Sequence, residues 1–386
     1  MVGPIPVMRF SIRSRSGVRT GLAMLASVTL SSALASPALA RQAGLPGGRI
    51  SCEVASKDSL SAAEQKQIKD SADGMIARLR DTDPQVSVRG RDEIIEPLAC
   101  EGVTVAFRAA FGQALEPALR ELIRGNDARL AANALLIVGK VKSSASPTLL
   151  RLGLEDRRAP VRLAAAAGYK ELLLPPSASL PDRTIEPVLA LLGEALGRET
   201  DPKVADVLIA ALDSARSSDA MRARANVQIV EGLTARLRET RAGDSTGAWG
   251  PAILRGVEAT KNTLLQQIGA NSVDREFARK AATLGAMALA YVADRVARDQ
   301  VTDQGALDQT LEAITASAEG EIVFAHSLAG GAETLRAIDL RNAYNRAVES
   351  GDATDFQRRL RSWIGPDGLF TKAPYNVPAA DLAIQR

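Results

Sequence analysis

Apolar residues recur at helical spacing along most of the chain beyond residue 60. In the stretch DARLAANALLIVGKV (127–141), the residues that share one helical face are Leu130, Ala134, Ile137, Val138 and Val141. Leu135 and Leu136 extend this apolar surface around the cylinder, which indicates neighbours on several sides. Aromatic residues make up 3% of the chain, and its frequent Ala, Leu, Arg and Glu favour helix over strand. The pattern therefore predicts an all-α protein.

Two kinds of helix start alternate along the chain. The first kind reads DPQV (83–86), DARL (127–130), APV (159–161) and DPKV (201–204). The second kind carries a proline where a helix is expected to begin, and reads EPAL (116–119), SPTL (146–149) and EPVL (186–189). Each kind recurs every ~30 to 45 residues, which is the period of helical repeat proteins. The alternation predicts a unit of helix, turn, helix, turn that is repeated.

The segment APVRLAAAAGYKEL (159–172) resembles the HEAT-type repeats of bacteria, including those described in phycobilisome lyases. In that pattern Asp-x-x-Val-Arg precedes an alanine-rich helix and a leucine. The resemblance is good over about 81–217, although DPQV and DPKV lack the arginine after valine. It implies an α-α superhelix, a HEAT-like solenoid, that works as a binding surface. The run Ala164–Ala167 fits this expectation, because small side chains let stacked helices approach closely.

The flanks of the repeats are expected to be helical as well. Ser61 and Glu64 form a capping-box pattern before a helix at 61–81. The Gly- and Ser-rich stretch TRAGDSTGAWGP (240–251) is the best internal boundary, and a C-terminal helical extension follows it. The helices expected there are 251–269, 273–298, 305–328, 332–350 and 356–365. The predicted organisation is a signal peptide at 1–40, a linker at 41–60, HEAT-like repeats at 61–240, a C-terminal helical region at 251–365 and a tail at 366–386.

The first forty residues carry the pattern of a secretory signal peptide. Four arginines and no acid precede the apolar stretch 21–34, and Ala38-Leu39-Ala40 forms a cleavage site. An uncleaved anchor is the alternative, but the apolar stretch is short for a spanning helix. Removal of four of the 48 basic residues leaves 44 against 45 acidic ones, a net charge of −1. We therefore expect a periplasmic or secreted protein, cleaved after Ala40, with no integral membrane segment and no affinity for nucleic acid.

The two cysteines, Cys52 and Cys100, lie near the expected mature N-terminus. In an oxidising compartment an isolated pair is predicted to form a disulfide, and two buried free thiols are the alternative. Two cysteines and one histidine do not supply the usual zinc patterns. No metal and no cofactor is expected.

The residues offer few signs of catalysis. His326 is the single histidine, and no Gly-x-Ser-x-Gly elbow, P-loop or dinucleotide-binding fingerprint is present, so no catalytic residue is predicted. The segment 81–92 resembles a calcium loop only faintly, because Val86 stands where glycine is needed. Arg157, Arg158 and Arg162 gather at one turn and could form part of a ridge that grips an acidic partner. The alternative is solvated turn charges paired with Glu121, Glu155 and Asp156.

Together these patterns favour a scaffold or adaptor that is exported, binds other proteins in the bacterial cell envelope and is not an enzyme. Two alternatives stay open. The first is an enzyme whose site lies in residues 251–386. The second is a small-molecule or glycan binder that uses a groove between the repeats and the C-terminal region.

Overall fold

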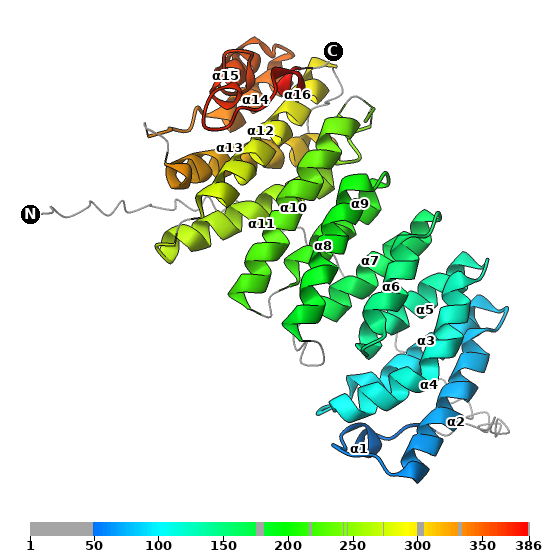
Figure 1. Ribbon diagram of the computed structural model, residues 1–386. Coiled ribbons are helices and arrows are strands. Elements are labelled where there is room, and N and C mark those ends of the chain that lie inside the picture. Colours follow the sequence, from blue (N-terminus) through cyan, green and yellow to red (C-terminus); the bar gives the residue numbers. More distant parts are fainter. Residues whose placement is uncertain are drawn as a thin grey trace, which may run out of the picture. The chain divides into compact units, whose positions relative to one another are not determined.

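The computed structural model describes residues 49–174, 181–215, 218–241, 243–244, 246–272, 274–298, 305–330 and 334–384. Every regular element within these ranges is a helix (Figure 1). The described residues belong to one compact unit, Gly44–Arg386. The predicted signal peptide and its cleavage site lie outside the described residues. None of the described helices combines the length and apolarity that crossing a membrane requires.

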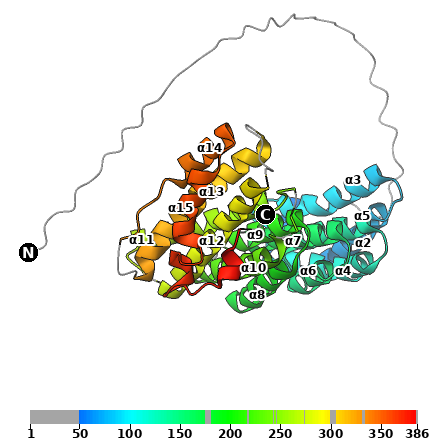
Figure 2. The ribbon, with the colours of Figure 1, turned by 90° about the horizontal axis from the view of Figure 1, so that it is seen from above.

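Most helices belong to two rows that alternate along the chain. The first row contains α2 (Ala62–Leu79), α4 (Val105–Arg124), α6 (Ser146–Leu154), α8 (Asp182–Arg198), α10 (Asp219–Thr240) and α12 (Arg275–Ala297). The second row contains α3 (Pro84–Ile95), α5 (Ala128–Val141), α7 (Ala159–Leu173), α9 (Pro202–Asp213), α11 (Gly250–Gly269) and α13 (Ala306–Ala329). Each helix packs against its partner in the other row and against the next helix of its own row, except between α6 and α8. Figure 2 shows α2, α4, α6 and α8 along one edge and α3, α5 and α7 along the other. This is an all-α helical solenoid, as predicted.

The remaining elements cover the two ends of this stack. At the start, α1 (Cys52–Ala55) and the 3₁₀ helix η1 (Glu96–Ala99) pack beside α3 and α4. At the other end, α14 (Leu340–Ser350) and α15 (Thr354–Ile364) form a hairpin against α13 and α12. The chain then continues through η2 (Leu369–Thr371) and α16 (Ala379–Leu382). The tail predicted at 366–386 is thus docked on the protein, because Phe370 and Leu382 are both fully buried.

Glycine and alanine allow the closest contacts between helices. A Cβ added to Gly139 of α5 would lie 2.6 Å from Cα of Gly168 on α7, so the two backbones touch. A Cβ on Gly232 of α10 would lie 2.7 Å from the carbonyl oxygen of Gly193 on α8. Within the run Ala164–Ala167, the first three alanines are buried in α7. Small residues therefore set the spacing within the rows, as the alanine run predicted.

The recurring aspartates of the first kind of helix start are N-caps. The carboxylates of Asp83, Asp127 and Asp201 accept hydrogen bonds from backbone N–H groups in the first turns of α3, α5 and α9. An N-cap satisfies donors that a helix cannot satisfy internally. The same signature therefore recurs because it caps the same end of three second-row helices, α3, α5 and α9.

Two of the three helix starts that were predicted from the second kind of signal are wrong. Pro117 lies inside α4 and Pro187 lies inside α8, and of the three proline signals only SPTL, at Ser146, begins a helix. Upstream apolar residues such as Phe107 and Ile185 are buried and extend these helices toward the N-terminus, which outweighs the cost of an internal proline. In the C-terminal part, α14 begins at Leu340 and not at 332. The pairing of helices continues through α11, α12 and α13, beyond the boundary predicted at 240–251; that domain boundary stays a prediction.

The predicted disulfide is confirmed. Cys52 and Cys100 are bonded, with Cα atoms 5.4 Å apart and 48 residues of separation. The bond ties α1 to the segment that follows η1. The loop-entropy model gives a stabilisation of roughly 4 kcal/mol for a loop of this length.

Candidate functional site

One opening on the first row of helices is a groove between α6 and α8. Helix α6 has 9 residues, whereas α4 has 20 and α8 has 17. The short helix leaves its neighbours unmatched in length, and α6 does not pack closely against α8 as other row neighbours do. The resulting cavity measures about 490 Å³. A gap in an otherwise close-packed row is therefore the first candidate site.

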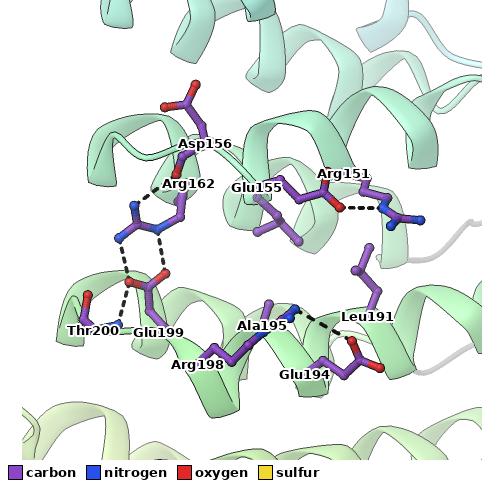
Figure 3. Close-up of a pocket in the computed structure, with 11 residues that line it drawn as sticks. Arg151, Glu155, Asp156, Arg162, Leu191, Glu194, Ala195, Arg198, Glu199 and Thr200 are labelled. Atoms are coloured by element: carbon purple, nitrogen blue, oxygen red, sulfur yellow. Dashed lines mark hydrogen bonds and ion pairs between the residues drawn. The ribbon is translucent and has the colours of Figure 1, made fainter.

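The groove combines an apolar floor with charged walls. Leu154, Leu191 and Ala195 line its floor. On the α6 side, Arg151 Nε donates to Glu155 at 2.7 Å (Figure 3). On the α8 side, Nη2 of Arg198 forms an ion pair with Oε2 of Glu194 at 3.7 Å (Figure 3). These wall side chains are more than half exposed, and the floor is left open between them.

The inner end of the groove is closed by a bidentate ion pair between two repeats. Arg162 of α7 donates from Nε and Nη2 to the two carboxylate oxygens of Glu199, at 2.9 and 2.8 Å (Figure 3). The side chains are 17% and 5% exposed. Glu199 also accepts the backbone N–H groups of Thr200 and Asp201, each at 2.9 Å. This pair fixes the turn between α8 and α9 to the start of α7.

The pKa shifts around the groove favour the charged forms. The hydrogen bond to Glu199 raises the pKa of Arg162, and the hydrogen bond to Glu155 raises the pKa of Arg151. The hydrogen bond from Arg158 lowers the pKa of Asp156 below its ordinary value. A general acid or base works best with a pKa near the operating pH. The pKa of each of these groups is shifted further from neutral pH. The groups therefore suit fixed electrostatic contacts better than proton transfer.

The three arginines predicted as possible partner-binding residues have different environments in the structure. Arg162 lines the groove and is held by Glu199. Arg158 donates to both oxygens of Asp156 and, through Nη1, to the carbonyl oxygen of Asn126 at 2.8 Å. Arg157 is exposed, and within the described ranges its guanidinium makes no hydrogen bond. The structure therefore brings one of the three into the groove and leaves one facing solvent.

The acids named in the alternative interpretation are all paired. Glu121 accepts from Arg80 at 2.6 Å, as Glu155 and Asp156 accept from their own arginines. Paired turn charges therefore describe Arg158 and Arg162 better than a free basic ridge does.

The structure gives structural roles to the other candidates from the sequence, His326 and the segment 81–92. Nδ1 of His326 lies 2.9 Å from the hydroxyl of Tyr375, which connects α13 to the docked tail. In the faint calcium loop, Asp81 accepts from the backbone of Asp83 and Asp83 caps α3. No group of three or more His, Cys, Asp or Glu side chains in the described part of the chain is placed to hold a metal ion.

One buried acid gave no sign in the sequence. Glu321 of α13 is fully buried, and its carboxyl group contacts the hydroxyl of Thr260 on α11. That hydroxyl also lies 3.0 Å from the carbonyl oxygens of Gly256 and Val257. The Thr260 hydroxyl donates to Oε1 of Glu321, and Oε2 of Glu321 has no hydrogen-bond partner among the described residues. Burial raises the pKa of Glu321 well above its ordinary value. Because it is inaccessible, we assign it to the core.

Comparisons of the chain with protein-family models, with curated proteins and with solved structures gave no significant match. The resemblance to HEAT-type repeats therefore stays a prediction.

Proposed function

We propose that this chain is a HEAT-like repeat scaffold that is exported to the bacterial cell envelope, binds another protein and carries out no catalysis itself. The observation that carries the proposal is the groove between α6 and α8. Its apolar floor can bury side chains of a partner, and its charged walls can set the orientation of that partner. A stack of helices also presents side chains from successive repeats on one surface.

Two features support export. The disulfide between Cys52 and Cys100 is typical of oxidising compartments. The N-terminal arginines, apolar stretch and A-x-A site fit a signal peptide that is cleaved after Ala40. The proposed location is therefore the periplasm or the exterior.

Site-directed photo-crosslinking in intact cells tests the protein-binding function. A photoreactive residue replaces Arg151 or Arg198, whose side chains are 62% and 74% exposed on the two walls of the groove. The control position is Ser362, which is exposed on α15 at the far end of the stack. We expect both wall positions to yield an adduct with the same protein, identified by mass spectrometry, and Ser362 to yield none.

A matched pair of substitutions makes the test specific. Leu191→Asp places a charge on the floor of the groove, whereas Leu265→Asp places one on α11, where the leucine is already 42% exposed. The first should abolish the adduct and the second should leave it unchanged. Absence of any adduct from the wall positions, or an equal yield from Ser362, would rule out this groove as the binding surface.

A further inference from the structure

A second cavity lies where α9, α10 and α11 meet. It measures about 530 Å³, within the ~300 to 1,000 Å³ range of small-ligand sites. Its lining is almost wholly polar, with Ala259 as the single apolar member. The lining residues are Asp213, Arg222, Asn226, Arg255, Glu258, Ala259, Asn262, Thr263 and Gln266.

The deepest polar group in this cavity, Asn226, has an unused acceptor. Asn226 is 3% exposed, and its Nδ2 donates to the carbonyl oxygen of Arg222 at 3.0 Å and to Oγ1 of Thr263 at 2.7 Å. The Thr263 hydroxyl donates its own proton to the carbonyl oxygen of Ala259 at 3.2 Å. Both neighbours of Nδ2 therefore act as acceptors, which fixes the orientation of the amide. Oδ1 of Asn226 has no partner among the described residues.

An unused donor accompanies this acceptor. Nε of Arg222, one turn before Asn226 on α10, is buried and also lacks a partner among the described residues. Its Nη1 makes a long contact of 3.4 Å with Gln266. A buried polar group left without a hydrogen bond costs about 1–3 kcal/mol, so native proteins rarely keep one without a use. The donor and acceptor together can receive a group that both donates and accepts.

The charges of the lining balance. Two arginines, Arg222 and Arg255, face two acids, Asp213 and Glu258. Arg255 additionally donates to Asp206 of α9 at 2.6 Å. An anion would meet the acids and a cation would meet the arginines, so neither is favoured. A protein segment or an apolar ligand would need apolar surface to bury, and Ala259 alone provides it.

We propose that this cavity binds a neutral, polyhydroxylated ligand, a short saccharide. Each sugar hydroxyl both donates and accepts, which matches a lining where guanidinium and amide N–H groups alternate with carboxylate and amide oxygens. One hydroxyl bridges Arg222 and Asn226. This site is separate from the groove between α6 and α8 and does not depend on the protein-binding function.

Saturation-transfer NMR and calorimetry on the full chain test the proposal. The probes are cellotriose, maltotriose and tri-N-acetylchitotriose, with trialanine as a peptide probe. We expect at least one saccharide to bind at one site per chain. Arg222→Ala and Asn262→Ala should each weaken its binding about tenfold, the equivalent of one lost hydrogen bond. Arg224→Ala is the control, because this arginine lies on α10 but pairs with Glu186 of α8 and does not line the cavity.

The outcomes decide the proposal. Asn262 is exposed, so its replacement should leave the melting temperature unchanged, and a loss of affinity would then report the cavity itself. The proposal is overturned if no saccharide binds at millimolar concentration, or if the cavity variants bind as tightly as Arg224→Ala. Tighter binding of trialanine, with the same sensitivity to Arg222→Ala, would replace the saccharide site with a peptide site. Crosslinking from the α6–α8 groove should be unaffected by either cavity variant.

Discussion

The close approach of α5 and α7 can be tested by a single added methyl group. The Cβ of Gly139→Ala would lie 2.6 Å from both Cα and the carbonyl oxygen of Gly168. Both obstructing atoms belong to the backbone, so no side-chain rotation relieves the overlap. The two helices must separate by several tenths of an ångström, and their shared apolar contacts loosen with them.

Two opposing terms set the size of this effect. Overpacking of this kind costs ~1–3 kcal/mol, while replacing a helical glycine by alanine returns up to ~1 kcal/mol. The net expectation is a loss of about 1–2 kcal/mol, equivalent to a roughly 5- to 30-fold shift in the folding equilibrium. Gly269→Ala is the matched control, since no atom lies within 4 Å of the added Cβ at the end of α11. That variant should be neutral or slightly stabilised.

Hydrogen exchange measured by mass spectrometry suits this protein, because repeat arrays need not unfold in a single step. Peptides from α5 and α7 should lose protection in Gly139→Ala, while peptides from α13 serve as an internal reference. In Gly269→Ala all three should match the parent. If Gly139→Ala were as stable as Gly269→Ala, the contact between the two backbones, and with it the packing of this row, would be wrong.

Three further predictions address the charged groups and the disulfide. Glu321→Gln should stabilise the protein at pH 7. The contribution of protonated Glu321 to stability is complete below its ordinary pKa of 4.5, and the folding equilibrium constant then falls by up to tenfold per pH unit as pH rises toward the higher folded-state pKa. Urea unfolding at pH 4.5 and 7 should therefore show an advantage for the variant that grows with pH. Arg162→Ala should cost roughly 2–3 kcal/mol by leaving Glu199 buried without its partner, whereas Arg198→Ala, an exposed pair, should change urea stability by less than about 0.5 kcal/mol. Reduction of the disulfide should lower the stability of the N-terminal end of the stack by roughly 4 kcal/mol, seen as faster hydrogen exchange in α2 and α4.

The fold could be predicted from the sequence where a local signal coincides with a structural need. Asp83, Asp127 and Asp201 recur because each caps the N-terminal end of a second-row helix. The alanines of α7 signal close packing, and three of them are buried where α7 packs against α5 and α9. Pro117 misled the prediction, because a proline marks a helix start only when nothing upstream holds the helix together. There, burial of Phe107 and Phe111 decided the outcome.

The sites were harder to predict, because they depend on distances between repeats. The shortness of α6 was visible in the stretch 146–156, but the gap it leaves depends on the position of α8. Arg162 and Glu199 are 37 residues apart, and no local pattern links them. Glu321 lies within an ordinary helical stretch, and its burial follows from α11 and α12 packing over it. The unused oxygen of Asn226 likewise depends on which neighbours already occupy its amide.

The turn arginines show why local charge was a poor guide to the binding surface. Arg129 donates to the carbonyl oxygen of Asp81, and Arg158 donates to that of Asn126, each reaching back to the preceding turn of the same row. Arg162 reaches forward to Glu199. Stacked turns end in unpaired carbonyls, and arginine satisfies several acceptors at once. Charge clustered at the turns of such a stack is thus explained by its assembly. Surface available to a ligand lies elsewhere on the stack, in the groove beside the short α6 and in the cavity at the junction of α9, α10 and α11.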